Sequence, residues 1–213
     1  MKYSALIALV TVTGLVMSVM PRIADARVGE SRAAFENRLF KNGGISYRNR
    51  NERESRRKGG PYTSYLKYLG NSAEVRIYFK SDDGRELTQS DVDNRSLGSG
   101  WEVHVLYVRG KSVLELYKRT GSISEYEMNA LLGILGDGAY WKKVEKTQVI
   151  EGEPEEEEPV SAFGFDYLRS DEAVRAKKSG GGLMVFQKQL DEFLAKQHES
   201  KLIQSAPQSV QGF

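Results

Sequence analysis

Residues 101–118 read Trp-Glu-Val-His-Val-Leu-Tyr-Val-Arg-Gly-Lys-Ser-Val-Leu-Glu-Leu-Tyr-Lys, and they have the pattern of a β-hairpin. Up to residue 108, apolar residues at positions 101, 103, 105 and 107 alternate with the residues between them, as in a β-strand. The segment Arg109-Gly110-Lys111 turns the chain, and Gly110 can adopt the positive φ that a tight turn requires. Both strands carry apolar residues on both faces. This predicts that the hairpin is central in a sheet and that helix covers one side of it.

Further strands are expected before the hairpin. Residues 73–80 place Ala73, Val75, Ile77 and Phe79 on one face of a strand and polar residues or Tyr78 on the other. Residues 62–69 are predicted to form another strand. Residues 88–100 are polar, contain two glycines, and are predicted to be a loop.

Two helices are predicted to flank these strands. The first covers residues 30–40, with Ser31 as its N-cap. The second covers residues 124–135 and begins with a capping box, in which Ser124 and Glu127 each accept a bond from an otherwise unpaired backbone N–H. We expect Trp141, beyond this helix, to pack back on the same core.

The C-terminal third begins after residues 151–159, Glu-Gly-Glu-Pro-Glu-Glu-Glu-Glu-Pro, whose like charges predict a solvated linker. Residues 163–168 and 183–186 are predicted strands, and residues 187–200 a helix. Residues 171–178 fit either a helix or a strand, because Ala173 and Ala176 suit a helix while the alternation also allows a strand.

The predicted fold class is therefore α+β: an antiparallel sheet of five or six strands, with the helices near 30–40 and 124–135 packed on one face. The expected organisation is a signal peptide over 1–26, an α+β domain over 27–150 and an acidic linker over 151–160. Residues 161–200 would complete the same domain, and residues 201–213 would form a loose tail.

The first 26 residues have the three-part order of a secretory signal peptide. Lys2 gives a positive start, residues 5–20 are uncharged and largely apolar, and Ala24-Asp25-Ala26 is a small-x-small cleavage site before Arg27. The apolar run is shorter than the roughly 20 residues that span a bilayer. We expect an exported protein, periplasmic or secreted. An uncleaved N-terminal membrane anchor is the alternative.

Composition excludes several classes of function. The chain of 213 residues has 31 Lys and Arg against 29 Asp and Glu, so it lacks the basic excess of a nucleic-acid-binding protein. It has no Cys, which excludes disulfides, zinc–thiolate sites and thiol nucleophiles. Neither a phosphate-binding loop nor a dinucleotide-binding glycine pattern occurs.

No catalytic, metal or cofactor site is predicted. The two histidines are His104, on a strand between two valines, and His198, in a polar helix. We interpret His104 as a hydrogen-bonded sheet residue and His198 as solvent-facing. No Gly-x-Ser-x-Gly nucleophile elbow is present, and the carboxylates Asp82, Asp83, Asp91 and Asp93 fall in polar loops rather than in a tuned pair.

Two groups of residues are candidates for binding. Tyrosines on predicted strands would make a recognition surface if they share an open sheet face; they are Tyr62, Tyr68 and Tyr78. A basic stretch without apolar residues would suit an anionic lipid or polysaccharide; its basic residues are Arg48, Arg50, Arg53, Arg56, Arg57 and Lys58. Ordinary sheet packing and a solvated loop are the respective alternatives.

Four short motifs carry a resemblance: Arg27-Val-Gly-Glu-Ser-Arg, Val108-Arg-Gly-Lys-Ser-Val, Ile123-Ser-Glu-Tyr-Glu-Met-Asn-Ala-Leu-Leu and Trp141-Lys-Lys-Val. With the stretch from Tyr167 to Ala176 they resemble a group of small, exported, functionally uncharacterised bacterial α+β proteins. That group implies no catalytic residues. A weaker likeness, to modules related to the outer-membrane assembly lipoprotein BamE and to beta-lactamase inhibitory proteins, implies function by protein binding. The chain departs from the lipoprotein pattern because it lacks the lipid-bearing Cys.

These observations favour a non-enzymatic exported protein that binds an envelope component. The expected partner is an envelope protein, an anionic polysaccharide or a lipid, without a cofactor. Two alternatives remain: a carboxylate-dependent hydrolase acting outside the cytoplasm, and a membrane-tethered structural protein.

Overall fold

The computed structural model describes residues 28–48, 59–145 and 160–205. Its centre is one eight-stranded antiparallel sheet in the order β1-β2-β3-β4-β8-β7-β6-β5. The strands are β1 (Gly44–Arg48), β2 (Ala73–Ser81), β3 (Gly100–Val108), β4 (Lys111–Arg119), β5 (Trp141–Lys143), β6 (Tyr167–Arg169), β7 (Val174–Ser179) and β8 (Gly182–Gln187). The α+β class and the antiparallel sheet are confirmed. The sheet has more strands than the five or six expected. Most of the segment 171–178, which fitted either a helix or a strand, belongs to β7, and the short strands β1 and β5 form the two edges.

The helical elements are α1 (Arg32–Lys41), α3 (Gln89–Asp93), α4 (Glu125–Gly136), α5 (Lys188–Gln204) and the 3₁₀ helices η1 (Pro61–Tyr68) and η2 (Gly70–Ser72). The strand predicted at 62–69 is therefore wrong. Pro61 stands at the start of η1, where its fixed φ and missing N–H are tolerated. The loop predicted at 88–100 contains α3, and the C-terminal helix runs to residue 204, into the segment expected to be a loose tail.

The central hairpin forms as predicted. Val103 pairs with Tyr117 and His104 with Leu116, and residues 109 and 110 make the two-residue turn. Arg109 and Gly110 both have positive φ, at 52° and 75°, as a turn matched to the twist of the strands requires. The capping box of α4 also forms: Ser124 Oγ accepts from the Glu127 N–H at 3.2 Å, and Glu127 Oε2 accepts from the Ser124 N–H at 2.9 Å.

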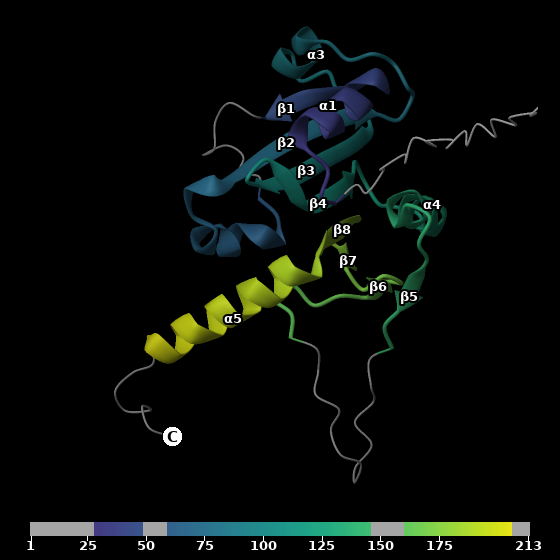
Figure 1. The fold of residues 1–213 in the computed structure, drawn as a ribbon. Helices are drawn as coiled ribbons and strands as arrows, with labels where there is room; N and C mark the ends of the chain where they lie inside the picture. Colours follow the sequence, from purple (N-terminus) through teal and green to yellow (C-terminus); the bar gives the residue numbers. More distant parts are fainter. Residues whose placement is uncertain (1–27, 49–58, 146–159, 206–213) are drawn as a thin grey trace, which may run out of the picture.

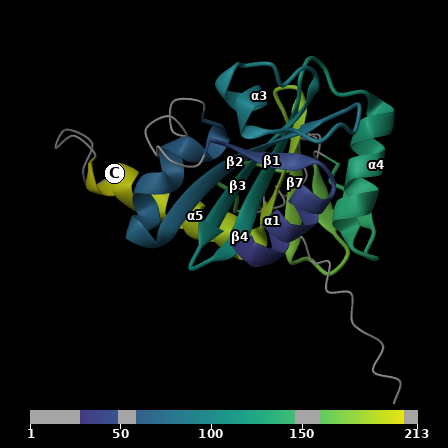
Figure 2. The same cartoon turned by 90° about the horizontal axis from the view of Figure 1, so that it is seen from above.

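Helical elements cover both faces of the sheet, rather than the one face expected. On the first face, Phe35 and Leu39 of α1 and Met128, Leu132 and Leu135 of α4 pack with the apolar side chains of β3, β4, β7 and β8. On the second face, Tyr62 of η1 and the α5 residues Leu190 and Leu194 form a separate core. Figures 1 and 2 show η1 and α5 side by side, with the C-terminal part of α5 running out beyond the strands. This arrangement explains why the central strands are apolar on both faces.

The element order repeats once along the chain. A helix and four strands, α1 with β1–β4, are followed by a second helix and four strands, α4 with β5–β8, and the two halves meet at the β4–β8 pair. Each helix has a serine N-cap, Ser31 or Ser124, and buries the residues four and eight positions later. Residues 28–48, 59–145 and 160–205 supply all eight strands and both cores that the structure describes. We expect the chain from Arg27 onward to fold on these contacts.

Candidate functional site

An open cleft of about 610 Å³ lies where β2, β3 and β4 end beside the first turns of α4. The strand register places Lys80, Trp101 and Arg119 side by side across the three strands, so their side chains share one face of the sheet. Trp101 lies in the middle of this row and is partly exposed. The residues that line the cleft are Lys80, Ser81, Asp82, Asp83, Trp101, Arg119 and Glu127.

The guanidinium of Arg119 is held on several sides. Its Nη2 lies 2.8 Å from Asp82 Oδ2, its Nε lies 3.0 Å from Glu127 Oε1, and its Nη1 donates to the Gly100 carbonyl at 3.2 Å. The guanidinium carbon lies 5.6 Å from the centre of the Trp101 ring. Arg119 is therefore a positioned donor group and not a freely rotating side chain.

Two carboxyl groups of the cleft, Glu127 and Asp83, have lowered pKa values. The Ser124 N–H, the Ser124 hydroxyl and the Arg119 guanidinium lower the pKa of Glu127 to about 2, in that order of importance. The Ser81 hydroxyl and the Arg85 N–H lower the pKa of Asp83. Groups in this state accept hydrogen bonds well, but at neutral pH they hold no proton to donate in general acid catalysis.

Lys80 differs from Arg119 because, among the described residues, its ammonium group has no hydrogen bond or ion pair. The lining set contains two cations and three carboxylates, so its charge is nearly balanced. With one aromatic ring and hydrogen-bonding groups of both kinds, the cleft can hold a ligand rich in hydroxyl groups.

The three candidate tyrosines do not share an open face, and the surface expected of them is not formed. Tyr62 is 1% exposed and lies on the η1 and α5 side of the sheet, whereas Tyr78 is 0% exposed and lies under α1 on the other side. Tyr68, at the end of η1, is partly exposed. The predicted strand at 62–69 is a 3₁₀ helix, so strand periodicity does not apply to these residues.

The basic candidates cannot be assembled into a site. Arg48 ends β1, an edge strand of the sheet. Arg50, Arg53, Arg56, Arg57 and Lys58 lie outside the described residues.

His104 has partners that the sequence did not reveal. Its Nδ1 lies 2.6 Å from the Tyr62 hydroxyl, and its Nε2 lies 2.8 Å from Glu102 Oε1. The carboxylate only accepts and the tyrosine hydroxyl has one proton to give, so all bonds are made when Nε2 carries the imidazole proton. Burial raises the pKa of Tyr62. Tyr62 and His104 are enclosed in the core, and their chain of bonds fastens η1 to the sheet.

A second polar surface lies at the far end of η1. The Lys67 and Lys201 ammonium nitrogens lie 5.0 Å and 5.7 Å from the centre of the Tyr68 ring. The Tyr68 hydroxyl lies 3.2 Å from His198 Nδ1. Because η1 and α5 are about 130 residues apart in the chain, no local pattern predicted this cluster.

Comparisons with family models, curated proteins and solved structures found no match. Within residues 28–48, 59–145 and 160–205, no helix is long and apolar enough to cross a bilayer. In the same ranges no three His, Asp or Glu side chains gather as metal ligands.

Proposed function

We propose that the protein is an exported, non-enzymatic binding protein that holds a hydroxyl-rich sugar segment of an envelope glycan in the Trp101 cleft. The observation that carries the proposal is the row formed by Lys80, Trp101 and Arg119. A sugar presents C–H groups to an aromatic ring and hydroxyl groups at its edge. The Trp101 ring can pack against the C–H groups of the sugar. The Arg119 guanidinium and the carboxylates beside it can form hydrogen bonds with the hydroxyl groups.

The near balance of charge in the cleft favours an uncharged sugar over a polyanion. Asp82 and Glu127 already share one guanidinium, which leaves Lys80 as the unpaired cation of the described cleft lining. A strongly anionic polysaccharide would meet three carboxylates here and would be repelled.

The hydrolase alternative is less well supported at this cleft. A carboxylate-dependent hydrolase needs one carboxyl that keeps a proton near neutral pH beside another that is ionised. The Ser124 and Arg119 contacts lower the pKa of Glu127 instead. Among the described residues, Glu115 is the carboxyl whose pKa burial raises, and it is fully enclosed within the sheet and outside the cleft.

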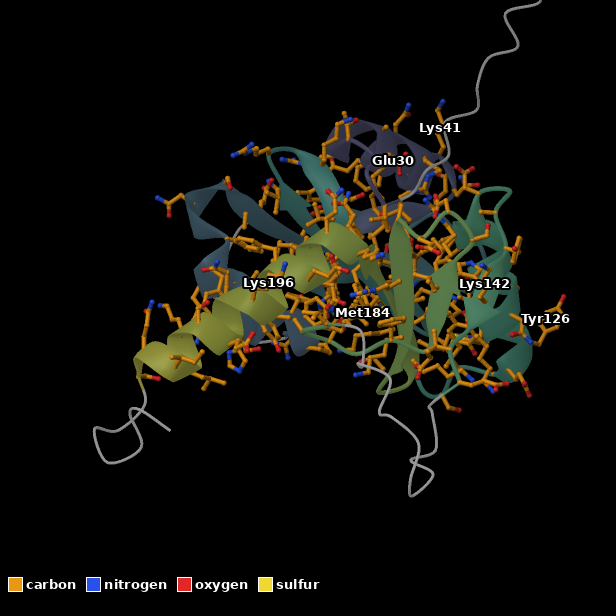
Figure 3. The ribbon with its side chains drawn as sticks, turned by 60° about the horizontal axis from the view of Figure 1, so that its bottom comes forward. Glu30, Lys41, Tyr126, Lys142, Met184 and Lys196 are labelled. Carbon is orange, nitrogen blue, oxygen red and sulfur yellow. The ribbon has the colours of Figure 1, made fainter. Side chains whose placement is uncertain are left out.

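Neutral oligosaccharides test the proposal directly, with chitooligosaccharides and maltooligosaccharides as probes. In a Trp141→Phe background the remaining tryptophan reports on the cleft, so a bound sugar changes its fluorescence. We expect Lys80→Ala to weaken binding, and Trp101→Ala to abolish binding measured by calorimetry. Tyr126→Ala is the matched control, because that ring is 83% exposed on α4 and projects away from the body of the protein (Figure 3).

Two results would reject the proposal. In the first, neither these probes nor isolated envelope glycan binds the chain that begins at Arg27. In the second, the probe is cleaved, which would favour the hydrolase. Export is tested separately by the N-terminal residue of the protein recovered from cells. Arg27 supports a cleaved leader, whereas Met1 on a membrane-bound chain supports the tethered alternative.

A further inference from the structure

The end of η1 and the last turns of α5 form one surface, which we call the η1–α5 tip. It consists of Lys67, Tyr68, His198, Lys201 and Leu202, and Leu202 follows His198 by four residues on the same side of the helix. The tip is on the opposite face of the sheet from α4, the helix beside the Trp101 cleft. Figures 1 and 2 show that α5 carries it beyond the edge of the strands.

The tip is cationic and lacks nearby counter-charges. Lys67 and Lys201 both approach the ring of Tyr68, and neither forms an ion pair with any described residue. Of the acids on α5, Asp191 and Glu192 pair with Arg175, while Glu199 is exposed and has no described ion pair with either lysine. Two ammonium groups therefore flank a phenol hydroxyl and an imidazole, all of which can bind an oxyanion.

The tip also exposes an aliphatic side chain beside these cations. Leu202 is 57% exposed and directly follows Lys201. A soluble polyanion would leave it in water. The boundary between lipid headgroups and acyl chains would bury it while the lysines contact phosphate.

We propose that the η1–α5 tip binds the surface of an anionic membrane, with Lys67 and Lys201 against lipid phosphates and Leu202 inserted below them. The proposal does not depend on the glycan cleft. It names as partner a bilayer that carries anionic lipid, because only this partner uses both the unpaired cations and the exposed leucine.

Vesicle co-sedimentation tests the proposal on the chain from Arg27 onward. The probes are phosphatidylcholine vesicles, the same vesicles containing phosphatidylglycerol, and a soluble polyanion, heparin. We expect binding to the phosphatidylglycerol vesicles that weakens with added salt, and little binding to phosphatidylcholine alone. The Lys67→Gln/Lys201→Gln double variant should bind them about thirty-fold more weakly, from about a five-fold loss for each lysine at the membrane surface.

Lys196→Gln is the matched control. Lys196 is an exposed lysine on the same helix, but it lies roughly 160° around the helix axis from His198 at 100° per residue (Figure 3). Its loss should change binding less than about two-fold. Leu202→Ser should weaken vesicle binding as well and leave heparin binding unchanged. Residues 67, 196, 201 and 202 are all outside both cores, so each variant should retain the thermal unfolding of the parent chain.

Three outcomes would overturn the proposal. The first is equal binding by the parent and the double lysine variant, or no vesicle binding by either. The second is vesicle binding that is insensitive to Leu202→Ser while heparin binds as tightly, which would indicate a polysaccharide surface. The third is a dimer in sedimentation equilibrium that Leu202→Ser disperses, with vesicle binding unaffected. Trp101→Ala should leave vesicle binding intact. Failure of the glycan proposal can therefore be distinguished from failure of the membrane proposal.

Discussion

Replacing Glu115 by glutamine tests the buried polar layer beneath α1. Glu115 is 0% exposed on β4, where it pairs with Val105 of β3 and Val185 of β8. Its Oε2 accepts from the Tyr117 hydroxyl, and its Oε1 has no hydrogen-bond partner among the described residues. Burial raises the pKa of Glu115, against smaller lowering effects of the Tyr117 bond, the Arg38 guanidinium and Ser112, while Glu30 adds to the rise.

The sign of the pH dependence follows from that direction. The folded-state pKa lies above the usual value of 4.5, so the folded protein binds this proton more tightly than the unfolded chain does. The contribution of Glu115 to stability is complete below pH 4.5 and is lost as the pH rises through the folded-state pKa. Each unit by which the pKa is raised corresponds to about 1.4 kcal/mol of lost stability at high pH.

Glutamine keeps the size of the side chain and cannot ionise. We expect Glu115→Gln to be about as stable as the parent at pH 4.5. At pH 8 it should be more stable by about 1.4 kcal/mol for each unit of the pKa rise. Urea unfolding followed by circular dichroism across this pH range measures the difference. Glu86→Gln is the control, because Glu86 is exposed in a loop and its replacement should not change the profile.

Destabilisation of the glutamine variant at every pH would refute the reasoning. It would mean that Glu115 is ionised in the fold and that its attraction to Arg38 outweighs desolvation. An unchanged pH profile would refute it equally. The lowered pKa of Glu127 does not confuse the measurement. Its stabilising effect is lost as the pH falls from about 4.5 towards about 2, and it cancels in the difference because both proteins contain Glu127.

Three further predictions concern stability. Ser124→Ala removes the N-cap of α4 and should cost about 1 kcal/mol in thermal unfolding; an unchanged melting temperature would show that the capping box contributes little. Leu194→Ala opens a cavity in the core beneath α5 and should cost about 2–5 kcal/mol, whereas Leu202→Ala on the exposed part of that helix should stay within about 0.5 kcal/mol; equal losses in urea unfolding would contradict the assigned packing. Gly182→Ala should disrupt the pairing of β8 with β4, because a Cβ there would collide with the β4 backbone, while Gly133→Ala has open space and should stabilise α4 by about 1 kcal/mol; the opposite order of melting temperatures would refute the packing at both positions.

Local patterns predicted the elements whose formation depends on their own residues. The hairpin over 101–118, the strand over 73–80 and the helix that begins after Ser124 all form as expected. In each, alternation, a turn glycine or a capping box favours one backbone conformation within a few residues. The strand predicted at 62–69 failed, because η1 begins at Pro61 and is held by the bond from Tyr62 to His104, a residue 42 positions away.

Both candidate binding surfaces depend on contacts that local patterns do not describe. The sequence predicted that Tyr68 shares a sheet face with Tyr62 and Tyr78. The structure instead places Tyr68 beside Lys201 and His198. The row of Lys80, Trp101 and Arg119 exists only once the register of three strands is set. Asp82 and Glu127 then come to the same guanidinium from different elements.

By itself, the sequence predicted a cysteine-free α+β chain with an apolar N-terminal segment, a central hairpin and a capped helix. Only the tertiary structure decided that eight strands join in one sheet, that both faces are covered, and which polar groups meet at the cleft and at the η1–α5 tip. The physical reason is the separation along the chain over which each property is determined. Backbone conformation depends largely on neighbours along the chain, whereas burial, ion pairing and exposure depend on how distant segments pack.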